Sequence, residues 1–317
     1  MIYTLTVNPS IDYHMVLGKE LVPGSINRAN EEIVYPGGKG INVSIMLRRL
    51  GSESVALGFI AGRTGDMLRQ LCQDLDCRSD FVQLPEGETR INVKVDGTKK
   101  ETAINGQGPQ IPADSVGALL EKISVLTPDD ILVVSGSFPK DSLYVCEAIY
   151  EAAAASGARL VVDTTGEALR KALAYKPFLI KPNEEELCDL FETMTASHKD
   201  IEELMHKAQQ IGAQNVLLSR GEKGAVYLSS DGRLFDVKLD RHIDPVSTVG
   251  AGDSLLAGFL ASIEQNRPLT YLGDETLKKA LRQGCAAGTA TAMTSWLAES
   301  EAVNSVKAFV KVTKAEL

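Results

Sequence analysis

After residue 105, short runs of β-forming residues alternate with longer stretches that have the apolar spacing of helices. The expected strands are residues 131–134, 160–162, 178–180 and 216–218. The expected helices run from about residue 141 and over residues 166–174, 184–191, 199–212, 251–265 and 274–293. A hairpin is expected from residues 225–228 and 234–237. Such alternation builds βαβ units in which helices cover a mostly parallel sheet. The sequence therefore predicts an α/β fold.

Two segments in the N-terminal third interrupt this alternation, at residues 13–35 and 89–105. The second segment is typical of two strands joined at Asp96-Gly97, since alternating apolar residues flank an Asp-Gly pair. We expect the two segments to form a small, mostly β lid that closes over a substrate and excludes water. An edge hairpin that extends the main sheet is the alternative.

Composition and charge exclude several classes of protein. The chain has 317 residues, of which 44% are hydrophobic, and a formal net charge of −9, which argues against general nucleic-acid binding. No apolar run approaches the roughly 20 residues that span a bilayer, and the N-terminus begins with strand-like residues in place of a basic segment, so we expect a cytoplasmic protein. The five cysteines include no C-x-x-C pair, which argues against disulfides and zinc.

The run from Ser247 to Ser254 places two glycines and a carboxylate at the start of an apolar helix. The first amides of a helix lack internal acceptors and lie at the positive end of its dipole, so they can bind a phosphate. Asp253 falls in this first turn. It either stabilises the helix start or accepts a proton from a substrate hydroxyl beside a bound phosphoryl group.

A second glycine cluster, residues 36–43, also opens an apolar helix. It is not a Walker motif, because Lys39 precedes a glycine, and no Gly-x-Gly-x-x-Gly follows a strand anywhere in the chain. Lys39 and Asn42 are one helical turn apart and face the same opening. The cluster is therefore either a helix start that needs positive φ or a ligand site.

Polar residues also follow several expected strands. The strand that ends near Lys181 is followed by Asn183 and three glutamates, Glu184 to Glu186. These residues either bind a ligand or are the acidic residues that are common in the first turn of a helix. Residues 219–224 follow the next strand as a glycine-rich turn. Ser137 and Asp163 end two further strands, and we expect Asp163 only to close a loop.

Four motifs, residues 8–12, 36–43, 181–186 and 247–254, resemble in their order those of the ribokinase-like family of sugar kinases. The resemblance covers nearly the whole chain. It implies one kinase domain over residues 1–317, folded as a three-layer sandwich with a mostly parallel sheet and a β lid from about residues 13–35 and 89–105.

The resemblance also assigns roles to individual residues. Asp253 would be the catalytic base, with an anion hole formed by Gly250, Ala251 and Gly252. The sugar would be bound by Asp12, Gly37, Gly38, Lys39, Asn42 and Asp253. The nucleotide would be bound by Lys181, Asn183, Ser219, Gly221, Gly224, Thr248, Gly250 and Gly252. Asn183 and Glu186 would orient Mg²⁺ through water, since this ion keeps most of its hydration.

Thr89-Arg90-Ile91-Asn92, together with residues 105–109, resembles the branch of the family that phosphorylates sugars already carrying a phosphate. Arg90 and Asn92 would then bind the substrate, with Ser137 touching its phosphate. Arg28, in the first lid segment, is a second candidate. The chain departs from the wider family at two positions. Ser247 stands where many members have an acidic residue, and the lid lysine of some members has no counterpart near Ser25.

The expected activity is transfer of a phosphoryl group from MgATP to the C6 hydroxyl of fructose 1-phosphate, giving fructose 1,6-bisphosphate. The alternatives within the family are tagatose-6-phosphate kinase and an enzyme for fructose 6-phosphate. A non-catalytic sugar-phosphate sensor is the alternative from another class. We also expect a homodimer built partly through the lid, because we expect one exposed face of its small sheet to include Ile33, Val34, Ile91 and Val93, which so small a lid cannot bury alone.

Overall fold

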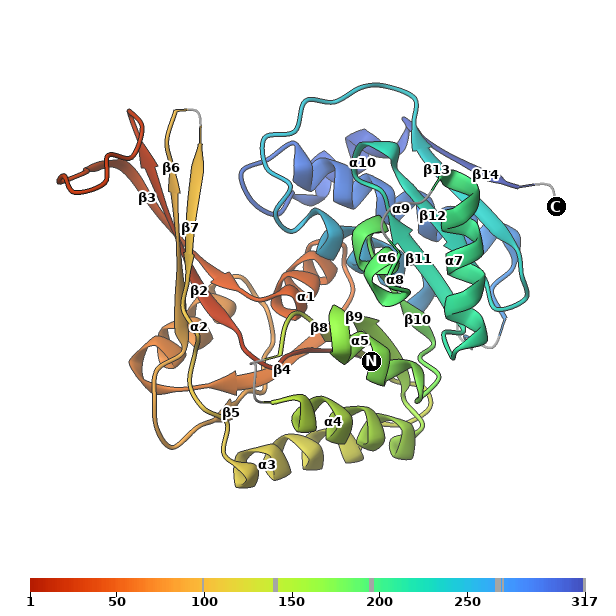
Figure 1. The fold of residues 1–317 in the computed structure, drawn as a ribbon, viewed down its shortest axis with the longest axis horizontal. Helices are drawn as coiled ribbons and strands as arrows, with labels where there is room; N and C mark the ends of the chain where they lie inside the picture. Colours follow the sequence, from red (N-terminus) through yellow and green to blue (C-terminus); the bar gives the residue numbers. More distant parts are fainter. Residues whose placement is uncertain (99, 139–141, 194–196, 266–268, 270, 316–317) are drawn as a thin grey trace.

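The large sheet forms the centre of the molecule (Figure 1). The computed structural model describes residues 1–98, 100–138, 142–193, 197–265, 269 and 271–315. Ten strands pair in the order β14-β13-β12-β11-β10-β9-β8-β1-β4-β5. Their bounds are β1 Ile2–Thr6, β4 Ser54–Ile60, β5 Val82–Gln83, β8 Ile131–Ser135, β9 Arg159–Asp163, β10 Leu179–Ile180, β11 Asn215–Ser219, β12 Ala225–Leu228, β13 Leu234–Leu239 and β14 Val310–Lys314. All pairs from β11 to β5 are parallel, whereas β12, β13 and β14 form an antiparallel edge.

Helices cover both faces of this sheet. The helices are α1 Lys39–Arg49, α2 Gly62–Asp74, α3 Ala113–Ser124, α4 Leu143–Ser156, α5 Gly166–Leu173, α6 Glu184–Leu190, α7 His198–Gln210, α8 Ala251–Glu264, α9 Asp274–Ala292 and α10 Ser300–Lys307. Residue 141, near which the sequence predicted that a helix begins, lies outside the described residues, and α4 begins at Leu143. No helix in the described part of the chain is long and apolar enough to cross a membrane.

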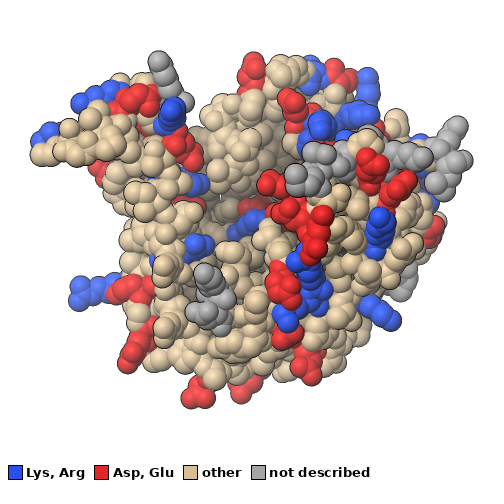
Figure 2. All heavy atoms as spheres, in the orientation of Figure 1, with Lys and Arg blue, Asp and Glu red and all other residues tan. Residues whose placement is uncertain are grey.

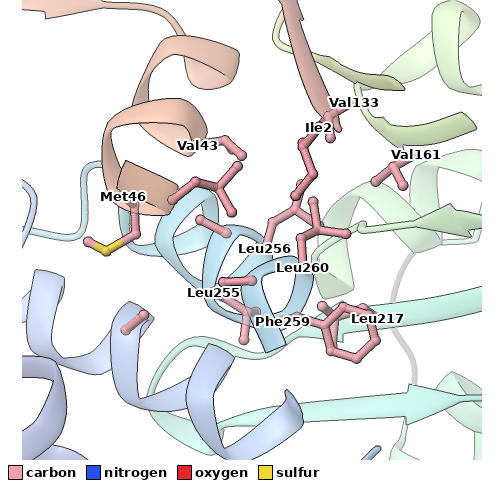
Figure 3. Packing of buried hydrophobic residues seen from close by; sticks show 14 of the residues in the cluster. Ile2, Val43, Met46, Val133, Val161, Leu217, Leu255, Leu256, Phe259 and Leu260 are labelled. Atoms are coloured by element: carbon pink, nitrogen blue, oxygen red, sulfur yellow. The ribbon is translucent and has the colours of Figure 1, made fainter. Parts of the chain in front are cut away.

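Side chains that alternate along the strands divide between two cores, one on each face of the sheet. In β8, Ile131 and Val133 join the core that contains α1, α2, α8, α9 and α10, whereas Leu132 and Val134 join the core that contains α3 to α7. Figure 3 shows Leu256 and Leu260 of α8 beside Ile2 of β1. The predicted three-layer α/β fold with a mostly parallel sheet is therefore confirmed.

A second sheet of four strands projects from the body (Figure 1). Its strands are β2 Ser10–Leu17, β3 Ala29–Gly37, β6 Arg90–Asp96 and β7 Glu101–Asn105, in the order β3-β2-β6-β7. β2 and β6 pair in parallel, which joins the two N-terminal segments in one small sheet. The alternative, a hairpin that extends the main sheet, is excluded. We refer to these four strands as the lid.

Two details of the lid differ from the expectation. Asp96 pairs with Glu101, so the hairpin loop begins only after Asp96 and is longer than an Asp-Gly turn. Glu20 contacts this loop, since it accepts a hydrogen bond from Thr98 Oγ1 and lies against Gly97.

The four apolar lid residues do not share one face. Val34 pairs with Tyr13 and Ile33 with His14, and neighbours along a strand point to opposite faces. Val34 therefore shares a face with Ile91 and Val93, while Ile33 lies on the face of Asp12.

Candidate active site

Two cavities meet between the lid and the carboxyl ends of the parallel strands. One has a volume of about 510 Å³ and the other about 870 Å³, and Ser219, Thr248 and Gly252 line both. Figure 2 shows the hollow between the lid and the body, with Lys and Arg atoms visible inside it. The site residues predicted from the sequence line one of the two cavities, except Gly37 and the second candidate Arg28.

The start of α8 forms the shared wall of the two cavities. Gly250 precedes the helix with a φ of 76°, in the left-handed region, and an added Cβ would lie 2.7 Å from Leu297 Cδ2. At Gly252, an added Cβ would lie 3.3 Å from Lys181 Nζ. Both glycines let the backbone approach its neighbours closely. The amides of Ala251 and Ser254 donate to the carbonyls of Thr248 and Gly250, whereas no hydrogen bond from the amides of Gly252 and Asp253 occurs within the described residues, so these two amides remain available to an anion.

Asp253 lies at the base of the smaller cavity and is only 5% exposed. Asn42 Nδ2 donates a hydrogen bond of 2.8 Å to Asp253 Oδ2. Burial and the nearby Asp163 carboxylate raise the pKa of Asp253 to about 6, although Lys39, Asn42 and Lys181 oppose this rise. A carboxyl group with this pKa is ionised at neutral pH and is a stronger base than a solvated aspartate.

Asp163 connects the two lysines of the site. Lys39 Nζ and Lys181 Nζ each lie 3.2 Å from Asp163 Oδ1. Burial disfavours the charge on Asp163, but the two lysines outweigh it and hold its pKa below the ordinary value. The Asp163 carboxylate in turn raises the pKa of Lys39. Sequence reasoning gave Asp163 only a loop-closing role. Its place at the end of a strand beside the site was the available signal.

The lid contributes a hydrogen-bonded polar cluster to the smaller cavity. Asp12 Oδ1 accepts hydrogen bonds from Ser10 Oγ at 2.8 Å and from Asn92 Nδ2 at 2.9 Å. Asn92 Oδ1 is buried without a partner among the described residues, so it remains able to accept from a ligand hydroxyl. Gly37 lies behind this cluster, where an added Cβ would lie 2.4 Å from Asp12 Oδ1. Gly37 therefore makes room for Asp12 and does not line the cavity.

The start of α1 has the same close packing. Gly38 precedes the helix with a φ of 124°, and an added Cβ would lie 2.7 Å from Thr6 Cγ2. Thr6 Oγ1 also accepts a hydrogen bond from the amide of Gly40. Sequence reasoning did not single out Thr6, Asn8 or Ser10 as lining residues, because none belongs to a glycine motif.

Arg90 lies where the lid meets the body. Its Nε donates to the carbonyl of Asn8 at 3.1 Å and its guanidinium also contacts the carbonyl of Gly106 at 3.4 Å. Burial lowers the pKa of Arg90, and Asp12 opposes this effect. Arg90 and Ser137 both line the smaller cavity. Arg28 is exposed and lines neither cavity.

The acidic residues after β10 have separate roles. Asn183 and Glu186 form a capping box, in which each side chain accepts a hydrogen bond from the other's backbone amide. Both also line the smaller cavity. Glu184 binds Arg220 Nε at 2.7 Å and Lys223 Nζ at 3.1 Å, so it holds the loop after β11 in place.

A magnesium ion held mainly through water fits these residues. Glu186 uses Oε2 for the cap, and no hydrogen bond to its Oε1 occurs within the described residues. The described part of the chain contains no cluster of three or more His, Cys, Asp or Glu that could enclose a metal. An ion that takes one or two protein ligands and keeps its waters needs no such cluster.

The larger cavity begins at the loop after β11. Gly221 and Gly224 both have left-handed φ values, 55° and 88°, and an added Cβ at Gly224 would lie 2.0 Å from the carbonyl oxygen of Val237. Further along, apolar side chains line the cavity, among them Leu239, Ile243, Leu255, Cys285 and Ala292. A glycine-rich entrance followed by an apolar interior suits a ligand with a charged end and a flat, largely apolar end.

The fold and this site define an α/β enzyme that transfers phosphoryl groups. Residues 6–301 match the model of the pfkB family carbohydrate kinase, and the chain belongs to this family, as the resemblance in its motifs indicated. It is 40% identical to the 1-phosphofructokinase of Bacillus subtilis (strain 168), covering 99% of this chain and 100% of that protein. It is 35% identical to the D-tagatose-1-phosphate kinase of Bacillus licheniformis, covering 99% of both. Phosphofructokinase-2 from Escherichia coli, solved in complex with fructose-6-phosphate, superposes with a TM-score of 0.87 at 28% identity, covering 97% of this chain and 98% of that chain.

Proposed function

We propose that this enzyme transfers the γ-phosphoryl group of ATP to the C6 hydroxyl of fructose 1-phosphate, which gives fructose 1,6-bisphosphate and ADP. The observation that carries the proposal is the meeting of the two cavities at Gly252, next to the buried Asp253. A sugar phosphate in the smaller cavity and ATP in the larger one would bring hydroxyl and phosphoryl groups together at the start of α8.

In this proposal Asp253 accepts the proton of the attacking hydroxyl, and Asn42 orients the carboxylate by its hydrogen bond. The amides at the start of α8 and the ammonium of Lys39 stabilise negative charge on the transferred group. Asn183 and Glu186 would hold Mg²⁺ through water, and the ion would neutralise charge on the nucleotide phosphates. The rate enhancement then comes mainly from positioning and from charge stabilisation.

Two arguments support a substrate phosphate bound near Arg90: the hydrogen bonds of Arg90 itself and the names of the relatives. Arg90 keeps donors available toward the smaller cavity while two backbone carbonyls anchor it. The names of the B. subtilis and B. licheniformis relatives both specify a 1-phosphate. A ketohexose 1-phosphate is therefore favoured over tagatose 6-phosphate, and fructose 6-phosphate remains an alternative because the E. coli structure binds it.

A panel of ketose phosphates tests the proposal. Purified protein, ATP and Mg²⁺ would be mixed in turn with fructose 1-phosphate, tagatose 1-phosphate, tagatose 6-phosphate and fructose 6-phosphate, and the release of ADP measured. We expect the highest kcat/KM with fructose 1-phosphate. Binding of a sugar phosphate without any release of ADP would contradict the proposal and would indicate a sensor.

Two further properties belong to the same proposal. The lid face that contains Val34, Ile91 and Val93 also carries the exposed Ile104, and we propose that it is buried in a homodimer. Both proposed substrates are phosphorylated metabolites, so we place the reaction in the cytoplasm.

A further inference from the structure

The loop between α9 and α10, residues 293–299, touches both the lid and the start of α8. Trp296, the single tryptophan of the chain, lies in this loop. Its ring stacks on Tyr35 of β3, with centroids 4.3 Å apart and an interplanar angle of 10°. The ring of His14 in β2 forms a T-shaped contact with Tyr35, with centroids 5.4 Å apart. The loop is therefore in direct aromatic contact with β3, and Tyr35 links it to β2.

Arg49, at the end of α1, fixes this loop to the body. Its guanidinium lies 5.0 Å from the centre of the Trp296 ring and donates to the carbonyls of Leu297 and Ala298. It also forms an ion pair of 2.8 Å with Glu299. One arginine thus holds the ring, two carbonyls and a carboxylate of the same loop, which leaves the loop little freedom to move independently.

The other side of the loop packs on the anion site. Leu297 is buried against Gly250, the left-handed residue that precedes α8. The amide of Ala298 donates to Thr291 Oγ1, which shares a hydrogen bond of 2.8 Å with Ser254 Oγ. Ser254 follows Asp253 directly. Leu297 therefore contacts Gly250 directly, and Ala298 is linked to Ser254 through Thr291, so the loop is connected to both ends of the segment proposed to hold the phosphoryl group.

We propose that Trp296 is a positioning residue that couples the lid to the anion site at the start of α8. When the lid closes on a sugar phosphate, Tyr35 moves with it, and the rigid loop transmits that shift through Leu297 to the backbone at Gly250. ATP then binds a fully formed anion site only when the sugar is present. This dependence protects ATP from hydrolysis by water. This inference rests on the proposed function, because it needs the lid to close on a sugar phosphate.

The coupling can be measured as a change in affinity. The dissociation constant of a non-hydrolysable ATP analogue with Mg²⁺ would be determined with and without saturating fructose 1-phosphate. We expect the sugar to tighten nucleotide binding in the wild-type enzyme by at least about fivefold, the lower end of typical couplings. In Trp296→Leu this ratio should fall below about twofold, while Trp296→Phe, which keeps an aromatic stack, should retain most of it.

Tyr271→Leu is the matched control, since it removes an aromatic ring that also lies beneath an arginine, Arg233, but outside both cavities. It should leave the coupling ratio and the turnover unchanged. If Trp296→Leu does not fold, as judged by circular dichroism, Tyr35→Leu removes the same stack from the lid side. In the wild-type enzyme, the fluorescence of Trp296 should change on titration with fructose 1-phosphate.

Two results separate this inference from the proposed function. A wild-type enzyme that phosphorylates fructose 1-phosphate, but shows the same coupling ratio as Trp296→Leu, overturns the role of Trp296 alone. A chain that releases no ADP with any ketose phosphate overturns the proposed function. In that case, a fluorescence change on binding of a sugar phosphate supports the contact between lid and loop, and unchanged fluorescence overturns it.

Discussion

Removal of the Asn42 side chain should shift the acid limb of the pH–rate profile toward higher pH. Asn42 donates to Asp253 Oδ2 over 2.8 Å in a site where Asp253 is buried. This hydrogen bond stabilises the charged form of the carboxyl group and therefore lowers its pKa. In Asn42→Ala the pKa of Asp253 must rise from its value of about 6.

The size of the shift follows from the strength of the bond. A hydrogen bond to a charged group contributes about 1.5–3 kcal/mol, which corresponds to roughly one to two pKa units. The pKa of Asp253 would then lie near 7 to 8, and its ionised fraction at pH 7 would fall from about 0.9 to about 0.1–0.5. The base must be ionised to accept a proton, so kcat/KM at pH 7, relative to its value at pH 9, should be about two- to tenfold lower than in the wild-type enzyme.

The assay is kcat/KM with both substrates below saturation from pH 5 to pH 9, because this parameter reports the pKa of the free enzyme, with ADP release coupled to a colour change. The phosphate groups of the substrates also titrate near pH 6, but they do so identically with every variant. Asn92→Ala is the matched control, because the hydrogen bonds of this second cavity asparagine go to Asp12 and Ser10, whereas Asn42 is the asparagine that donates to Asp253. The same acid limb in wild type, Asn42→Ala and Asn92→Ala would refute the assignment of Asp253 as the titrating base.

Three further outcomes are expected. Asp253→Asn should keep the fold and ligand binding but lower kcat by roughly 10²–10⁴, and a variant that retains more than half of wild-type kcat would remove Asp253 from the mechanism. Arg90→Ala should weaken phosphosugar affinity about ten- to hundredfold with little change for ATP, and Arg90→Lys should restore only part of it. An equal loss of affinity for unphosphorylated fructose would mean that Arg90 stabilises the lid and does not bind the phosphate. Light scattering at micromolar concentration with ligands should give twice the 34.1 kDa of one chain, and a mass near one chain would exclude the dimer.

Much of the fold could be predicted because local patterns and tertiary structure agree in the second half of the chain. The strand expected at residues 216–218 is observed as Asn215–Ser219, and the helix expected at 251–265 as Ala251–Glu264. Several elements were not anticipated, among them α2, α3 and β14. β14 pairs with β13 at the edge of the sheet and alternates Val310 and Val312 with Lys311 and Thr313, a pattern that resembles an ordinary polar tail.

The residues of the candidate site could be predicted where they belong to glycine-rich motifs. Gly250 and Gly38 have positive φ values, and an added Cβ would lie 2.7 Å from a neighbouring side chain at each of them, whereas at Gly252 it would lie 3.3 Å from Lys181 Nζ. Glycines that are needed for such reasons are visible in a sequence. Asp163 was not assigned to the site, since its importance arises from Lys39 and Lys181, which are distant in the chain and converge only in the fold. The role of Glu184 was invisible for the same reason, because its partners Arg220 and Lys223 follow another strand.

The charges of the site explain how a protein of net charge −9 can act on two anionic substrates. Lys39 and Lys181 share one oxygen of Asp163, so this group carries one net positive charge, which the ionised Asp253 cancels. Glu186 also lines the smaller cavity and acts on Lys39, so the lysines do not leave an excess of positive charge there. In the proposed mechanism, Arg90 and the helix-start amides therefore provide the attraction for phosphates. Any phosphoryl charge that Mg²⁺ leaves unneutralised would lie near Asp253 and would raise its pKa further. As the proposed base, Asp253 would then be stronger when the nucleotide is bound, which is when the hydroxyl proton has to be accepted.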